Sequence, residues 1–207
     1  MVRGEARVGH GNAWSGQASR RRILAAAGAM LGTAWVSDRF LDAAGAQPSP
    51  SKAQDVRILQ LVLQLEYTQV AFYEQAIRQA GLRGELREFA ETALRHERHH
   101  LAAIRSALGS KAGPKPRFDF DQKTKSERAF RQAAIALEDA AVASYNGQAA
   151  NLTKPTLTAA ATIVSVEARH AAWVRAIAGE IAAPRPVDKP MTAAEAARAL
   201  HAIGLRP

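Results

Sequence analysis

The sequence predicts an all-α protein: a bundle of four long helices with a short further helix near the C-terminus. Beyond residue 50, Ala, Leu, Arg, Glu and Gln dominate, and these residues favour helices. Apolar residues recur there at steps of three and four, the period of an amphipathic helix. Gly and Pro interrupt this pattern at intervals that leave segments long enough for a bundle.

Residues 1–46 differ from the rest and predict an export signal. Ser19-Arg20-Arg21-Arg22 precedes an uncharged run rich in Ala and Gly, which resembles a twin-arginine signal. The apolar run is too short to span a bilayer comfortably, and Ala44-Gly45-Ala46 offers a cleavage site. We therefore expect a twin-arginine translocase as a partner and a periplasmic or otherwise extracytoplasmic location. The alternative is an Arg-rich arm that is amphipathic or disordered.

Residues 47–183 are expected to form the bundle. The first helix should run from Ser51 to Ala80 and end at Gly81, and the second from Glu85 to Leu108, before Gly109. Because only a few residues separate these two helices, they should be antiparallel.

The third helix should begin at a capping box formed by Thr124 and Glu127, and continue to about Ala150. The fourth should follow Thr153, with Pro155 in its first turn, and last to about Ile181. These two helices are also close in sequence and should form a second antiparallel pair.

The second and third helices are joined by a longer segment, Ser110–Lys123. Fully extended, it would reach about 45 Å, and a helix of about 26 residues is about 39 Å long. A crossover along the whole bundle is therefore expected. Residues 184–207 should form a Pro-rich linker and a short helix, opened by a Thr192–Glu195 capping box and ending near Gly204.

Composition excludes several classes of function. The chain has no cysteine, which excludes disulfides, thiolate metal sites, iron–sulfur clusters and thiol nucleophiles. Its net charge is +9, but Lys and Arg are scattered through every segment and form no basic helix face interleaved with aromatics. We therefore expect a generally solvated basic surface and no nucleic-acid partner.

Each long helix carries a glutamate in the middle of its apolar stripe, and two of them carry a histidine three residues later. The set is Glu66, Glu97 with His100, Glu138, and Glu167 with His170. Residues at i and i+3 share a helix face, so each Glu-x-x-His pair offers an oxygen and a nitrogen to one ion. Carboxylates that face a core need a cation. This ligand pattern is typical of two-metal sites in ferritin-like proteins.

The position of these residues along the helices supports the same interpretation. Counted from the two short turns, all four glutamates lie at about the same height in the bundle. We expect each Glu-x-x-His pair to serve one ion, with Glu66 and Glu138 bridging or capping the two. The alternative is a set of structural salt bridges to nearby arginines such as Arg98 and Arg169.

Other polar side chains surround this pattern. Tyr73 and Tyr145 each lie seven residues beyond a site glutamate, on the same face, and are candidates for hydrogen bonding to the ligands or for supplying electrons. Core packing is the alternative role. His96 and His99 point to other faces, so we expect them to be exposed or to contact a ligand rather than to bind metal.

The segments Leu65-Glu66-Tyr67, His96-Glu97-x-x-His100, Leu137-Glu138-Asp139 and Val166-Glu167-Ala168-Arg169-His170 resemble the bacterial ferritin-like domain family, over roughly residues 55–180. The resemblance implies a di-iron-type site at all six ligand positions, with the same six residues as the catalytic candidates. The resemblance also implies export, because members of this family are often exported by a twin-arginine signal. No rubredoxin-like cysteine module is present to donate electrons.

The first hypothesis for function is a di-iron oxidoreductase, in which two iron ions react with dioxygen or peroxide. Fe(II) oxidation and peroxide removal are examples of such reactions. A manganese catalase-like enzyme is the second, because its ligand types are the same. A non-enzymatic, stress-related bundle with a structural or vestigial metal is the third. A small homo-oligomer is also expected.

The same pattern predicts how metal and stability are coupled. Without metal, the four carboxylates should raise one another's pKa and take up protons. If the two histidines are neutral, replacing Glu97 or Glu167 by Ala should therefore leave the metal-free fold intact.

Replacing Arg20 and Arg21 together by Lys should block export, because the signal depends on the arginine pair. The measurement is the extracytoplasmic fraction of the protein in cells that express each form. An unchanged fraction would show that another route carries the chain.

Overall fold

The computed structural model describes residues 49–206, and helices dominate this part of the chain. Four long helices are followed by a short one, with three 3-10 turns and two short strands between or after them. The helices are α3 (Lys52–Gln79), α4 (Gly84–Leu108), α5 (Glu127–Gln148), α6 (Lys154–Ile177) and α7 (Ala193–Ile203), and the strands are β1 (Arg117–Phe118) and β2 (Leu205–Arg206). The prediction of an all-α four-helix bundle with a short C-terminal helix is confirmed.

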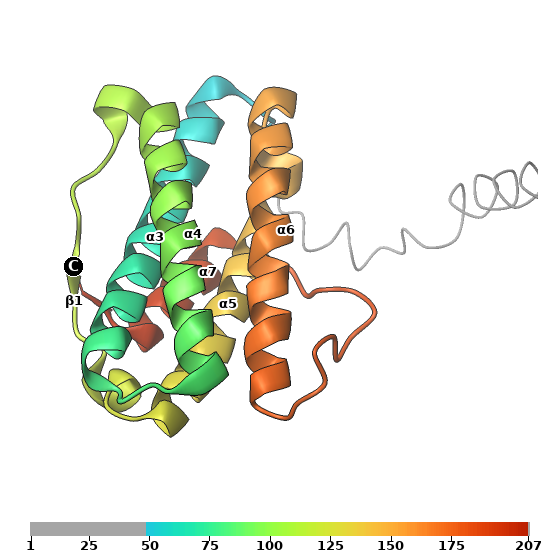
Figure 1. The fold of residues 1–207 in the computed structure, drawn as a ribbon. Helices are drawn as coiled ribbons and strands as arrows, with labels where there is room; N and C mark the ends of the chain where they lie inside the picture. The colour runs from blue at the N-terminus through green and yellow to red at the C-terminus, as the bar shows by residue number, and fades with distance from the viewer. Residues whose placement is uncertain (1–48, 207) are drawn as a thin grey trace, which may run out of the picture. The chain divides into compact units, whose positions relative to one another are not determined.

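The long helices pack as two antiparallel pairs, α3 with α4 and α5 with α6 (Figure 1). The first pair is joined by a turn in which Gly81 and Gly84 adopt φ values of 68° and 51°. A side chain is strained in this left-handed region, so glycine suits both positions. The short turn brings the end of α3 beside the start of α4, which sets the relative height of their site residues.

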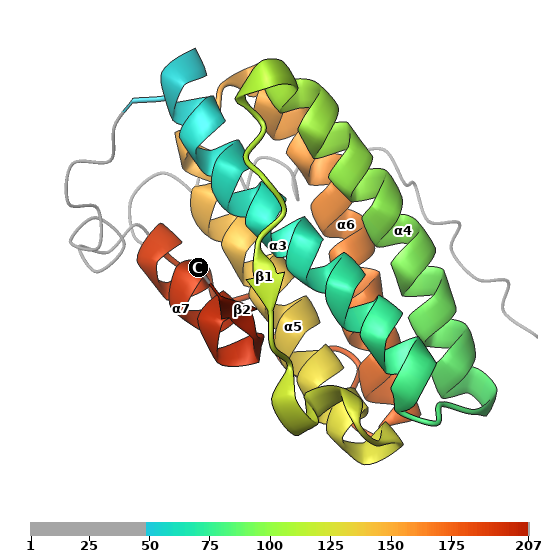
Figure 2. The same ribbon diagram turned by 90° about the vertical axis from the view of Figure 1, so that its left-hand side faces the viewer.

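The connection between α4 and α5 runs along the length of the bundle, as expected from its reach (Figure 2). Midway it forms β1, which pairs antiparallel with β2 near the C-terminus, Arg117 opposite Arg206 and Phe118 opposite Leu205. Gln60 of α3 fixes the start of the crossover, because its amide oxygen accepts a hydrogen bond from the Gly113 backbone at 3.2 Å. The pairing of β1 with β2 therefore holds both the crossover and the C-terminal strand in place.

Two predicted helix boundaries are wrong. Ser126, not Thr124, caps α5: its hydroxyl accepts a hydrogen bond from the Ala129 backbone at 3.3 Å. Thr124 instead lies buried in a 3-10 turn, where its hydroxyl accepts hydrogen bonds from Gln75 and Gln79 of α3. Glu127 accepts from the Arg83 backbone at 2.7 Å, so tertiary contacts use both residues of the expected capping box.

Helix α6 ends at Ile177, four residues before the predicted end at Ile181. Gly179 has a φ of 75°, a left-handed conformation that stops the helix. The first turn of α6 is as expected, with Pro155 near the start of the helix. The predicted Thr192–Glu195 capping box is confirmed at the start of α7.

The core next to the α3–α4 turn is aromatic. Phe72, Tyr73, Phe89 and Phe130 come from three helices and are each 0% exposed. Their rings lie with centroids 5.4 to 6.5 Å apart in edge-to-face, tilted and stacked pairs. Each of these residues lies on the turn side of the glutamate in its own helix. This cluster therefore closes one end of the glutamate layer.

The C-terminal segment packs onto the bundle. Helix α7 lies against α5 and α3, and Leu200 and Ile203 are 2% and 7% exposed. The linker before it crosses α5 closely: a side chain at Gly147 would lie 1.8 Å from the Met191 carbonyl oxygen, so only glycine fits there. Linker, helix and strand thus belong to the packed structure.

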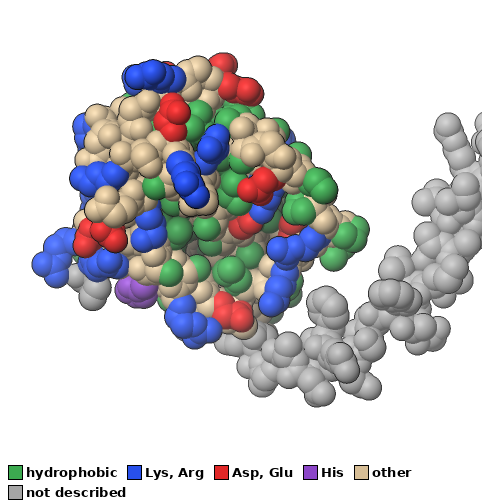
Figure 3. Space-filling view, turned by 90° about the horizontal axis from the view of Figure 1, so that it is seen from below, with side chains coloured by type: hydrophobic (Ala, Val, Ile, Leu, Met, Phe, Trp, Pro, Cys, Tyr) green, Lys and Arg blue, Asp and Glu red, His purple; other side chains and the backbone are tan. Residues whose placement is uncertain are grey.

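Charges on the outer surface are mixed. On the face seen from the α3–α4 end, basic and acidic side chains are interspersed and leave no continuous basic patch in that view (Figure 3). Within residues 49–206, no helix is both long and apolar enough to cross a membrane. The predicted export signal at residues 1–46 lies outside the described residues.

Leu200→Ala should destabilise the protein by about 2–5 kcal/mol, because it opens a cavity between α7 and the bundle. Leu157→Ala is the matched control, since Leu157 is 37% exposed on α6. Urea denaturation of both variants measures the difference. Equal, small losses would mean that α7 contributes little to the stability of the fold.

Candidate metal centre

Six side chains from the four long helices meet in the middle of the bundle. They are Glu66 of α3, Glu97 and His100 of α4, Glu138 of α5, and Glu167 and His170 of α6. All four glutamates are 0% exposed, and the histidines are 9% and 2% exposed. Their ligand atoms form two groups of four, and within each group the atoms lie within 4.8 Å of one another. The structure thus brings together every ligand candidate named from the sequence.

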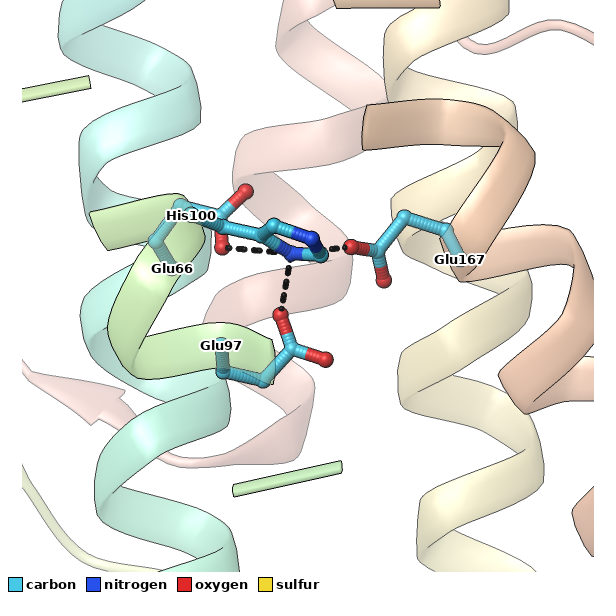
Figure 4. Close-up of side chains that lie close together, drawn as sticks. All are labelled: Glu66, Glu97, His100 and Glu167. Atoms are coloured by element: carbon cyan, nitrogen blue, oxygen red, sulfur yellow. Dashed lines mark hydrogen bonds and ion pairs between the residues drawn. The ribbon is translucent and has the colours of Figure 1, made fainter. Parts of the chain in front are cut away.

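The first group surrounds the His100 imidazole. Its Nδ1 lies 2.9 Å from Glu97 Oε2, 2.9 Å from Glu167 Oε1 and 3.8 Å from Glu66 Oε2. The carboxylates arrive from three different helices and point at one nitrogen (Figure 4). One nitrogen and three oxygens therefore converge on a single small region.

The second group repeats this arrangement around His170. Its Nδ1 lies 3.0 Å from Glu97 Oε1, 3.4 Å from Glu138 Oε2 and 3.9 Å from Glu167 Oε2. Again one nitrogen and three carboxylate oxygens come together. The two groups are alike in composition, as two equivalent hairpins would produce.

Glu97 and Glu167 belong to both groups. Each presents one oxygen to His100 and the other oxygen to His170. Glu66 and Glu138 belong to one group each. The carboxylates of the Glu-x-x-His pairs are therefore the shared ones, instead of each serving one group. Glu66 and Glu138 cap one group each, which is one of the two roles expected for them.

Burial and crowding shift the acidity of the carboxyl groups. Burial, together with the nearby carboxylates, raises the pKa of Glu66 well above its ordinary value and that of Glu167 to about 8. Burial also acts on Glu97, but the hydrogen bond with His100 and the close contact with the His170 imidazole outweigh it and bring its pKa below the ordinary value. Glu97 is therefore the anion on which the metal-free site is centred.

The histidines are not neutral in the metal-free site, contrary to our expectation from the sequence. Burial lowers their pKa, but the surrounding carboxylates outweigh it and raise the pKa to about 10 for His100 and about 11 for His170. At neutral pH both imidazoles are cations. They offset the carboxylate charge that we expected to be relieved by proton uptake alone.

Both tyrosines singled out in the sequence donate hydrogen bonds to ligand candidates. Tyr145 donates to Glu66 Oε1 at 2.6 Å, and Tyr73 donates to Glu138 Oε1. Burial and the adjacent carboxylate raise the pKa of each phenol well above 10, so both remain donors. Each tyrosine thus fixes one of the two capping glutamates.

His96 contacts the site from outside. Its Nδ1 lies 2.9 Å from His170 Nε2, on the side of the ring opposite the carboxylates. Burial and the neighbouring His170 lower the pKa of His96, which favours a neutral ring that accepts a hydrogen bond. Such a contact fixes the tautomer and orientation of a ligand histidine. His99 is exposed, as expected.

Gln69 is a site residue that the analysis of the sequence missed. It is 0% exposed, and its amide donates to Glu167 Oε2 at 2.9 Å and lies near both oxygens of Glu138 at 3.4 and 3.5 Å. Its position three residues after Glu66 repeats the spacing of the two Glu-x-x-His pairs. That spacing was the signal available in the sequence, because Gln69 occupies on α3 the place that histidine has on α4 and α6.

The salt-bridge alternative does not fit the geometry. Arg98 pairs with Glu74 at 2.8 Å, and Arg169 lies 3.5 Å from the Ser165 hydroxyl. In the part of the chain that the structure describes, the four buried glutamates form ion pairs with histidines alone.

Several buried polar atoms of the site lack a hydrogen-bond partner. They include Glu66 Oε2, Glu97 Oε1, Glu167 Oε1 and His170 Nδ1. Two of these atoms lie 3.0 Å apart, so they are close without being aligned for a hydrogen bond. Unpaired buried carboxylate oxygens are costly unless a cation binds them. Carboxylate oxygens and imidazole nitrogens are suitable ligands for transition metals such as iron and manganese.

The fold and the site define a class: helical bundles with a buried cluster of carboxylates and histidines suited to metal binding. A comparison with protein families matches residues 54–180 to the ferritin-like domain. The chain belongs to this family. No match was found among curated proteins.

Glu97→Gln should destabilise the metal-free protein by roughly 3 kcal/mol, because it removes the anion that both imidazolium rings share. Glu66→Gln should change stability by less than about 1 kcal/mol, since an amide resembles the neutral carboxyl group and accepts from Tyr145 equally well. Urea denaturation in the presence of a chelator compares them. Equal losses would contradict the assignment of Glu97 as the central anion.

Proposed function

We propose that the protein binds a pair of transition-metal ions, iron in first place, and uses them to react with dioxygen or peroxide. Fe(II) oxidation and peroxide removal are the proposed reactions. One observation carries this proposal: Glu97 and Glu167 each present one oxygen to the His100 group and the other to the His170 group. Such sharing suits two ions side by side better than one.

The ligand assignment follows from the two groups. Glu66 and His100 would hold one ion, Glu138 and His170 the other, and Glu97 and Glu167 would contact both. When bound, the ions would exchange electrons with dioxygen or peroxide, which no side chain of this cysteine-free chain can do as readily.

The remaining residues of the site have roles that do not depend on the ions. Tyr145 and Tyr73 hold the capping glutamates in place through their hydroxyls. His96 orients His170 and, being only partly buried, connects that imidazole with solvent. This contact gives protons a route between the buried site and the surface.

The proposal includes export. It rests on the arginine pair Arg20–Arg21, the short apolar run and the cleavage triplet at 44–46. A twin-arginine translocase carries folded proteins, so the ions would be inserted before transport. That order would let the cell choose which metal occupies the site.

Metal analysis of the mature chain tests the central claim. After anaerobic reconstitution with Fe(II), we expect two ions per chain, with Fe(II) oxidation when dioxygen or peroxide is added. Glu66→Ala and Glu138→Ala should each lower the stoichiometry to one ion, because each glutamate belongs to one group. Glu97→Ala should abolish binding at both positions.

Glu74→Ala is the matched control, since Glu74 lies on α3 with Glu66 but pairs with Arg98 at the surface. It should retain two ions and full activity. A stoichiometry below one in the parent protein would overturn the two-ion proposal. Two ions without turnover would favour a structural metal, and turnover with Mn(II) alone would favour a catalase-like enzyme.

A further inference from the structure

A groove of about 600 Å³ lies between α4 and α6 at the end of the bundle away from the α3–α4 turn. Leu59, Ile104 and Ile163 are buried along it, and the small side chains Ala103, Ala107 and Ala159 leave the space open. Its volume lies within the range of about 300–1,000 Å³ that is usual for small-molecule sites.

The inner end of the groove lies next to the candidate metal centre. Ile104 follows His100 by four residues, and Ile163 precedes Glu167 by four, so each lies about 6 Å from the ligand along its helix. The aromatic cluster closes the opposite side of the glutamate layer. The His100 side chain is 11% exposed, against 3% for His170 and 0% for the glutamates. The site is therefore least covered on the His100 side.

The outer end of the groove is basic. Lys52 begins α3 and Lys111 follows α4, and both are exposed. Neither forms an ion pair with any residue between 49 and 206.

Asp55, the one acidic side chain lining the groove, is engaged elsewhere. Its oxygens accept hydrogen bonds from the Thr153 backbone at 2.9 Å and from the Thr153 and Thr156 hydroxyls at 2.5 and 2.7 Å. The Asp55 carboxylate is thus engaged by the start of α6 and does not pair with the two lysines, so both lysines can bind an anion.

We propose that this groove binds an aliphatic molecule with an anionic head group, such as a medium-chain carboxylate. The head group lies between Lys52 and Lys111, and the chain runs over Leu59 and Ile163 toward His100. From Pro155 to Ile163 the groove extends for about 12 Å along α6, a length that a chain of about ten carbons would fill. Charge complementarity selects this ligand, and its binding site requires no metal.

Titration calorimetry with decanoate tests the proposal on the metal-free mature protein, so that a failure of the two-ion proposal does not affect the result. Ala103→Phe fills the groove and should weaken decanoate binding at least tenfold. Ala102→Phe is the matched control, because Ala102 is exposed on the same helix but does not line the groove. It should bind as the parent does, and circular dichroism checks that both variants fold.

The head group is tested separately. Lys52→Ala combined with Lys111→Ala should weaken decanoate binding about tenfold and leave 1-decanol binding unchanged. Equal decanoate affinity in the parent and Ala103→Phe, or no binding by the parent, would overturn the proposal. A concentration-dependent dimer that Ala103→Phe abolishes, without decanoate binding, would instead show that a second copy of the chain covers the groove.

Discussion

The burial of four carboxyl groups in one layer of the bundle is the constraint on which the rest of the site depends. Without compensation, such a layer would strongly oppose folding. The chain compensates with two imidazolium rings and two tyrosine hydroxyls, all supplied by the same four helices. The metal-free fold is therefore tolerable, and several acceptors are still left for a cation. The residues that make the buried layer stable are thus the same residues whose chemistry suits metal binding.

The two sides of this layer differ. Toward the α3–α4 turn, Phe72, Phe89 and Phe130 pack tightly and exclude water. Away from it, small side chains on α4 and α6 leave a groove. The ligand layer is thus least covered on the His100 side. This difference between the two sides explains why His100 is the more exposed of the two histidines, although the groups around them are alike in composition.

The two groups also differ in what surrounds them. His170 has His96 behind it, and Glu138 and Glu167 have the Gln69 amide beside them. Among residues 49–206, the polar contacts of the His100 ring are with the glutamates of its own group alone, and Gln69 reaches this group only through the shared Glu167. The two groups therefore have different surroundings: the His170 group has the larger hydrogen-bonded network, and the His100 group is the less covered of the two.

The sequence by itself determined the bundle, its two antiparallel pairs, the crossover and the six convergent side chains, because helical period and turn position are local properties. Tertiary structure decided the rest. Which carboxylates are shared depends on how four helices face one another, so Glu97 and Glu167 could not be told from Glu66 and Glu138 by spacing. Thr124 and Glu127 do not form the expected capping box, because their side chains hydrogen-bond to α3 and to the α3–α4 turn. The charge of His100 and His170 depends in large part on carboxylates of other helices, whose distances no single helix encodes.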